Sequence, residues 1–159
     1  MLALGLYLAS ELPATAKPAP RALEVPGFLP AVLLAPPGNE PRPLLVAAHG
    51  AGGSPEWECE YWSRLLERPF FVLCLRGSSL GKAGGYYFKN EHALEAELLA
   101  AERQARQTEP RITSAGGVYA GFSQGSSFGS AIIARHGASF PQLALIEGFQ
   151  RWNIPRARA

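Results

Sequence analysis

Short apolar runs recur along the chain from residue 44 onward, and more polar segments with helical periodicity separate them. The runs show no alternation of apolar and polar positions, which is typical of strands buried on both faces of a sheet. We expect four such strands, at residues 44–48, 70–75, 118–120 and 143–146.

A helix is expected between the first two runs. Ser54 is suited to cap it, with Pro55 at its first position, and the pattern extends to about Glu67. Three apolar side chains then fall on one face of this helix: Trp57, Tyr61 and Leu65. Bulky residues such as Trp57, Trp62 and Phe128 are expected in the core rather than in a ligand pocket.

Two further helices are expected between the later runs. One opens at Asn90 and Glu91 and carries an apolar stripe made of Leu94, Leu98, Ala101 and Ala105. The other spans residues 124–136, turns Phe128 and Ile132 toward the sheet and ends at Gly137. Alternating strands and helices predict an α/β fold, with a mostly parallel sheet and helices on both faces, over residues 44–159.

The region before residue 44 has a different composition. Residues 17–43 are rich in proline and leave room for short edge strands only, such as 31–35. Residues 1–16 are apolar and end in Ala14-Thr15-Ala16, which resembles a signal-peptidase site, although no Lys or Arg precedes the apolar run. A first strand or an arbitrary start codon is the alternative, so the compartment stays open between cytoplasm and, with less support, export.

Composition limits the classes of partner. The 15 basic and 13 acidic residues are spread along the chain, which argues against nucleic acid as a partner. No uncharged apolar stretch is long enough to span a membrane. We expect no cofactor and no metal, because neither phosphate-loop nor metal-ligand spacing occurs.

Cys59 and Cys74 are expected to be buried free thiols, with a disulfide only in an exported protein.

Candidate chemistry follows two of the expected strands. The third strand runs into Gly121-Phe122-Ser123-Gln124-Gly125, a G-x-S-x-G sequence between a strand and a helix. In that context the serine lies on a strained turn that raises its hydroxyl, and the small flanking residues avoid a clash. Ser123 is therefore a candidate nucleophile, with Gly121 and Gly125 shaping the turn.

The first strand runs into a glycine-rich segment, residues 49–53, which we call the glycine loop. Its backbone N–H groups could stabilise a developing oxyanion. We expect two donors, Gln124 and either Ala51 or Gly52. Gly50 and Gly53 are interpreted as support for this loop. His49 ends the strand that is expected to neighbour the strand before Ser123, so it is expected near that serine.

With these motifs, the sequence resembles the α/β-hydrolase superfamily over roughly residues 43–148, in particular its carboxylesterase, phospholipase and polyester-depolymerase branches. The resemblance rests on the glycine loop, on Arg76-Gly77 and on the turn at Ser123. It implies hydrolysis of a small-molecule ester, or an amide, through an acyl-enzyme on Ser123. It also implies a catalytic acid and then a histidine later in the chain. For His49 the resemblance implies a structural role, in which the ring orders the glycine loop by hydrogen bonding and does not act as a base.

The residues after Ser123 depart from that pattern. They contain one histidine, His136, and one acid, Glu147. At 1.5 Å per residue, His136 would lie about 18 Å along the helix from Ser123, too far to act as its base. Glu147 follows the fourth strand and is a weak candidate for the acid, although an ion pair with a nearby Arg is the preferred interpretation. His92 is expected to be an exposed first-turn residue.

Two functions remain open. The first is a serine hydrolase whose sequence is truncated after its nucleophile half, with little turnover and an apolar edge strand at residues 143–146. The alternative is a catalytically inactive binding domain of the same fold. The loop at residues 78–90 either contacts substrate or is a flexible crossover. The sequence leaves the substrate and the oligomeric state undetermined.

Overall fold

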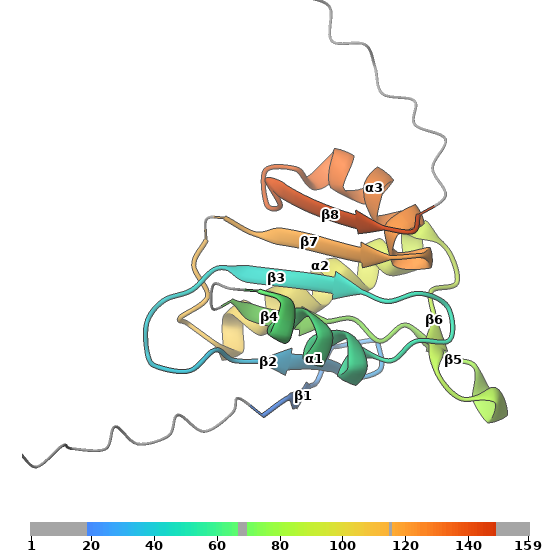
Figure 1. Cartoon of the computed structure of the whole chain (residues 1–159), viewed down its shortest axis with the longest axis horizontal. Coiled ribbons are helices and arrows are strands. Elements are labelled where there is room, and N and C mark those ends of the chain that lie inside the picture. Colours follow the sequence, from blue (N-terminus) through green and yellow to red (C-terminus); the bar gives the residue numbers. More distant parts are fainter. Residues whose placement is uncertain (1–18, 67–69, 115, 149–159) are drawn as a thin grey trace, which may run out of the picture.

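The computed structural model describes residues 19–66, 70–114 and 116–148. The four apolar runs form strands that lie parallel to one another in the spatial order β4-β3-β7-β8. Each strand lies within one or two residues of its predicted position: β3 (Leu44–Ala48), β4 (Phe71–Cys74), β7 (Val118–Phe122) and β8 (Gln142–Ile146). The predicted α/β class with a mostly parallel sheet is confirmed (Figure 1).

The proline-rich region supplies two more strands to the same sheet, β1 (Arg21–Leu23) and β2 (Ala31–Leu34). β2 pairs antiparallel with β1 on one side and with β4 on the other, and all four of its residues are buried. The expectation of short edge strands therefore holds for β1 and is wrong for β2, which is short but lies inside the sheet. Pro30 and Pro36 flank β2 without entering it, so its residues keep their backbone donors for both neighbours.

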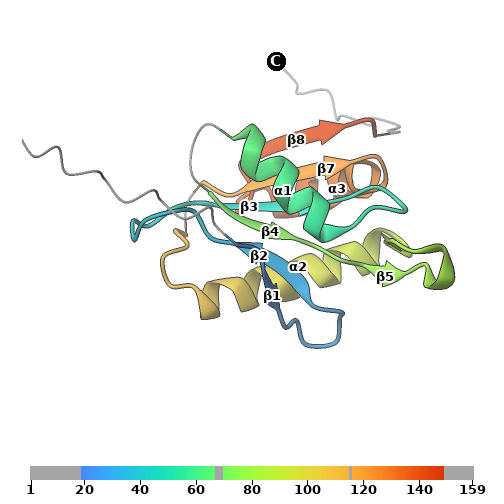
Figure 2. The same cartoon turned by 60° about the horizontal axis from the view of Figure 1, so that its bottom comes forward.

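One face of the sheet is covered by α1 (Pro55–Leu65), and the other by α2 (Glu91–Thr108) and α3 (Gln124–His136) (Figures 1 and 2). The predicted caps are confirmed, since the side chains of Ser54 and Asn90 accept the backbone N–H groups of Trp57 and Ala93. The predicted apolar stripe of α2 is also confirmed. It packs into the core together with Ile132 of α3, and Phe128 lies partly buried against this cluster.

The apolar face predicted for α1 points outward. Trp57, Tyr61 and Leu65 are exposed by 56%, 40% and 55%, so the expectation that Trp57 belongs to the core is wrong. The helix instead buries Glu58, Cys59 and Trp62. The indole N–H of Trp62 donates to Glu58 Oε1 over 2.8 Å, and this bond allows a carboxyl group to lie on the inner face.

Cys59 of α1 and Cys74 of β4 form a disulfide, with Cα atoms 5.7 Å apart. The default prediction of two free thiols is therefore wrong, while the prediction of burial is right, because neither residue is exposed. Helix α1 packs directly over β4, and this contact brings two cysteines 15 residues apart within bonding distance. The proximity depends on which face of α1 points inward, and the apolar pattern predicted the wrong face.

Strand β8 is less buried than the pattern predicted. Two of its five residues are exposed, including Leu143 at 44%, and the others are half-buried. Within the described residues β8 pairs only with β7, and it forms one edge of the sheet. A continuous apolar run is thus compatible with an edge strand as well as with a central one.

Candidate active site

Ser123 lies on a sharp turn between β7 and α3, where its φ is +48° and its ψ is −104°. In the described part of the chain, only Ser123 and Glu147 have a positive φ without being glycine. Such a conformation is costly for a residue with a side chain, and it persists where the surroundings enforce it. Ser123 therefore occupies the strained turn that the sequence predicted, between the strand and the first residue of the helix.

The glycines around Ser123 are required by close approach. A Cβ atom on Gly121 would lie 2.7 Å from the carbonyl oxygen of Gly125, and one on Gly125 would lie 2.0 Å from the carbonyl oxygen of Ala48. Both distances are far below van der Waals contact. The first turn of α3 therefore lies directly on the end of β3, and no larger residue fits at either position.

Three hydrogen bonds tie this turn to its neighbours. The N–H of Ser123 donates to the carbonyl of Ile146 at the end of β8, over 2.9 Å. The N–H of Gly125 donates to the carbonyl of His49 at the end of β3, over 3.2 Å. The hydroxyl of Tyr119, a fully buried residue of β7, donates to the carbonyl of Gly125 over 2.7 Å. The turn is thus fixed by all three adjacent strands.

The glycine loop faces Ser123. A Cβ atom on Gly50 would come within 3.0 Å of the Cβ of Ser123. The backbone N–H groups of Ala51 and Gln124 donate to no described residue, so both are free to bind a ligand. The N–H of Gly52 donates to the carbonyl of Tyr86 over 2.8 Å and is therefore already occupied. This bond corrects the expectation that Ala51 and Gly52 are equivalent donors.

Tyr86 belongs to a short hairpin made of β5 (Ser78–Ser79), a 3₁₀ turn (Gly81–Ala83) and β6 (Tyr86–Tyr87). The N–H of Tyr86 also donates to the carbonyl of Gly53, so the hairpin pairs with the glycine loop through two backbone hydrogen bonds. The N–H of Phe88 donates to Oε1 of Gln124 over 2.8 Å. The segment at residues 78–90 is thus tied to both parts of the candidate site.

His49 is buried beneath the glycine loop, with 1% of its surface exposed. Its Nδ1 lies 2.7 Å from the carbonyl oxygen of Gly50, and its Nε2 lies 3.0 Å from that of Arg76. The ring stacks on Phe88 with centroids 4.9 Å apart. Burial lowers the pKa of His49, and a neutral ring has one N–H to donate to these two carbonyls. Both nitrogens therefore face main-chain oxygens, and in the neutral ring only one of them donates a hydrogen bond.

The other two histidines contact Glu95 of α2, whereas Glu147 follows the β8 residue whose carbonyl accepts the N–H of Ser123. His136, on the last turn of α3, lies 2.7 Å from Glu95 of α2 and joins an ion cluster with Arg135. The side chain of His92 is 87% exposed, as predicted. Glu147 directly follows β8, is exposed and has a φ of +54°. It makes no ion pair with a described residue, so its preferred interpretation as the partner of an Arg finds no support.

Sequence reasoning missed three charged residues near the glycine loop, of which only Glu97 is buried. The Arg76 guanidinium, which follows β4, pairs with Glu56, donates to the carbonyl of Pro30 and lies 4.9 Å over the ring of Tyr86. Glu97 of α2 is 2% exposed and accepts the backbone N–H groups of Arg76 and Gly77. The sequence could have indicated that Glu97 is buried, because it lies three residues after Leu94 and therefore on the apolar face of α2.

Solved structures with the same arrangement of strands and helices include several hydrolases. A membrane phospholipase A aligns with a TM-score of 0.56 and 20% identity, over 85% of this chain and 41% of its own. The acylaminoacyl peptidase of Pyrococcus horikoshii aligns with a TM-score of 0.57 and 14% identity, over 83% of this chain and 23% of its own.

Est1E of Butyrivibrio proteoclasticus gives a TM-score of 0.57 and 20% identity, over 78% of this chain and 49% of its own. This chain has the α/β-hydrolase fold. It spans less than two thirds of the length of each of these three structures. No protein-family model and no curated protein matches the sequence.

None of the helices in the described residues has the length and apolar character needed to cross a membrane. In the same residues, no group of three or more His, Cys and Glu side chains is placed to hold a metal ion.

Proposed function

We propose that the protein is a serine hydrolase that acts on carboxylic esters, or on amides, through an acyl-enzyme on Ser123. The observation that carries the proposal is the backbone of Ser123, whose positive φ is enforced by contacts too close for any Cβ at Gly121 or Gly125. Strain that the surroundings enforce is typical of functional positions. The α/β-hydrolase fold of the neighbouring structures supports the same reaction class.

The chemistry follows from the groups near this turn. The Ser123 hydroxyl oxygen would attack the substrate carbonyl and lose its proton to a base, and the carbonyl oxygen would become an oxyanion. The N–H groups of Gln124 and Ala51 would donate to that oxyanion, since both lack another described acceptor. The alcohol or amine would then leave with a proton, and water would release the acid from Ser123.

The described residues supply no base for this step. The hydroxyl of Ser123 makes no hydrogen bond to a described side chain, and the three histidines of the sequence are buried under the glycine loop, exposed or paired with Glu95. A serine without a proton acceptor is a poor nucleophile at neutral pH. We therefore expect the 159-residue chain to turn over slowly. Glu147 is a weak candidate for the catalytic acid, because it follows the strand next to Ser123.

Labelling with a fluorophosphonate tests this function. Without a base, we expect the folded chain to be labelled at Ser123 slowly, but faster than the unfolded chain, because the N–H groups of Gln124 and Ala51 stabilise the developing negative charge. Peptide mass spectrometry locates the label, and Ser123→Ala should abolish it. Chain unfolded in urea provides the control for nonspecific reaction. Equal labelling of Ser127, a half-buried serine one turn along α3, would contradict the assignment.

The second candidate function is a catalytically inactive domain that uses the fold to bind a ligand. The hydroxyl of Ser123 has no described side chain as hydrogen-bond partner, and this favours the second function, because a binding domain needs no activated serine. The same labelling experiment separates the two functions. An inactive binding domain would react with the fluorophosphonate no faster when folded than when unfolded.

A further inference from the structure

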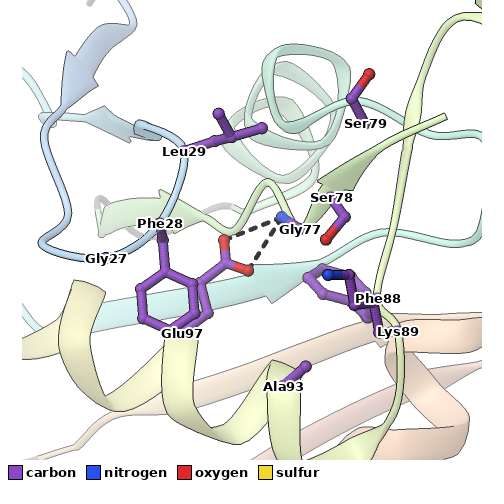
Figure 3. Close-up of a pocket in the computed structure, with 10 residues that line it drawn as sticks. All are labelled: Gly27, Phe28, Leu29, Gly77, Ser78, Ser79, Phe88, Lys89, Ala93 and Glu97. Carbon is purple, nitrogen blue, oxygen red and sulfur yellow. Dashed lines mark hydrogen bonds between the residues drawn. The ribbon is translucent and has the colours of Figure 1, made fainter. Parts of the chain in front are cut away.

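A cavity of about 500 Å³ lies beside the loop that follows β4 (Figure 3). Ser123 is not among the residues that line it. Its walls come from the turn between β1 and β2, the start of the hairpin, and the first two turns of α2. The lining residues that matter here are Phe28, Leu29, Phe88, Lys89 and Glu97.

The charge inside this cavity is the carboxyl group of Glu97. Its Oε1 accepts the N–H of Arg76 over 2.7 Å and the N–H of Gly77 over 3.0 Å, and its Oε2 shares the N–H of Gly77. No cationic side chain of the described residues lies within ion-pair distance of it, and the guanidinium of Arg76 is bound to Glu56. Burial raises the pKa of Glu97, while the two backbone donors favour its ionised form.

A cationic group would therefore complete the surroundings of Glu97. Two backbone donors leave acceptor capacity on Oε2, since a carboxylate offers about four acceptor positions. Burying a carboxylate without an opposite charge is costly, and a bound ammonium group would offset part of that cost. Phe28 and Phe88 line the same cavity. Phe28 is 36% exposed and provides most of the apolar surface for the rest of a ligand, while Phe88 is 1% exposed and forms the base of the cavity.

The position of Lys89 indicates which kind of ligand suits the cavity, a simple cation or a zwitterion. It lines the same cavity, its side chain is exposed, and it makes no ion pair with a described residue. A purely cationic ligand would be repelled by this ammonium group. A ligand with an ammonium at one end and a carboxylate at the other would satisfy both charges.

We propose that this cavity binds a small zwitterion of the amino-acid class, with its ammonium group on Glu97, its carboxylate on Lys89 and its apolar body against Phe28 and Phe88. Binding here does not depend on the reactivity of Ser123, so the site stands whether or not the chain is a hydrolase.

Titration with three matched probes tests this proposal. 6-Aminohexanoate carries both charges, hexylammonium only the positive one and hexanoate only the negative one. Isothermal calorimetry should show that 6-aminohexanoate binds about tenfold more tightly than either single-charge probe, as one charged hydrogen bond would give. Equal affinity for all three probes would overturn the proposal.

Two variants separate the roles of the charges. Glu97→Gln keeps an oxygen for the two backbone donors and should remove the advantage of 6-aminohexanoate over hexanoate. Lys89→Gln should remove its advantage over hexylammonium. Glu102→Gln, on the same helix but paired with Arg106, is the matched control and should change neither ratio.

If Glu97→Gln does not fold, Lys89→Gln alone tests the proposal. This variant is expected to fold, because Lys89 is exposed and makes no ion pair with a described residue. If the folded variants bind all probes as the unmodified chain does, the cavity is not a zwitterion site and Glu97 serves only to hold the loop at Arg76 and Gly77.

Discussion

Ser123 and Glu147 follow adjacent parallel strands, and both have a positive φ, of +48° and +54°. Their surroundings differ. Ser123 is held by three strands and by glycines that leave no space for a Cβ, whereas Glu147 is exposed and makes no ion pair with a described residue. A similar backbone conformation is thus enforced by packing and hydrogen bonds at one strand end, and is exposed to solvent at the other. What distinguishes them is how strongly the neighbouring residues enforce the conformation.

The largest effect should come from filling the space beside Ser123. Gly125→Ala would place a Cβ 2.0 Å from the carbonyl oxygen of Ala48, so either β3 or α3 must move. We expect a loss of about 3 kcal/mol in the free energy of unfolding, at the upper end for overpacked sites, together with loss of fluorophosphonate labelling. Urea denaturation measures the first and mass spectrometry the second.

The matched control lies at the other end of the same helix. Gly137 has a φ of −58°, and a Cβ there would have its nearest neighbour at 3.4 Å. Gly137→Ala should therefore stabilise the protein by about 0.5 kcal/mol, because alanine loses less entropy on folding. Similar losses in both variants would show that the close contact at Gly125 is not what fixes the turn.

A smaller effect compares the two strained residues directly. Glycine tolerates a positive φ, so Ser123→Gly should raise the free energy of unfolding by about 1 kcal/mol relative to Ser123→Ala. Glu147→Gly should gain less over Glu147→Ala, because an exposed strand end can relax without disturbing the sheet. Thermal denaturation of the four variants measures both differences. A larger gain at Glu147 would reverse the ranking of the two sites.

The smallest effect concerns the far end of α3, which is held by charges rather than by close packing. Arg135 and His136 lower the pKa of Glu95 from its usual 4.5 to about 2. Since the pKa is lowered in the folded state, this contribution to stability is present above pH 4.5 and is lost as the pH falls toward 2. The urea midpoint should fall over that range, and by less in Glu95→Gln. If the urea midpoint falls equally with pH in both proteins, the ion pairs of Glu95 contribute nothing to stability.

Local patterns predicted the strands and helices that carry the candidate site. The spacing of Gly121, Ser123 and Gly125 predicted the turn, because that spacing reflects contacts within a few residues. The hydrogen bond from the N–H of Gly52 could not be predicted, because its acceptor is the carbonyl of Tyr86, which lies in a hairpin more than 30 residues away in sequence. The inner face of α1 was also missed, because Glu58 becomes compatible with burial only through the N–H of Trp62. Errors of this kind arise where one contact reverses the preference of an isolated side chain.

Because Cys59 and Cys74 form a disulfide, the stability of a sample depends on whether the chain folded under reducing or oxidising conditions. Closing a loop of this length stabilises a folded chain by about 3 kcal/mol, a large part of the stability of a domain of this size. Because both sulfurs are inaccessible to solvent in the folded protein, a reductant reaches them only after α1 has lifted from the sheet. Protein folded with reduced thiols and protein folded with the disulfide would therefore differ in stability and interconvert only slowly. Melting temperatures can be compared only between samples whose thiol content has been measured.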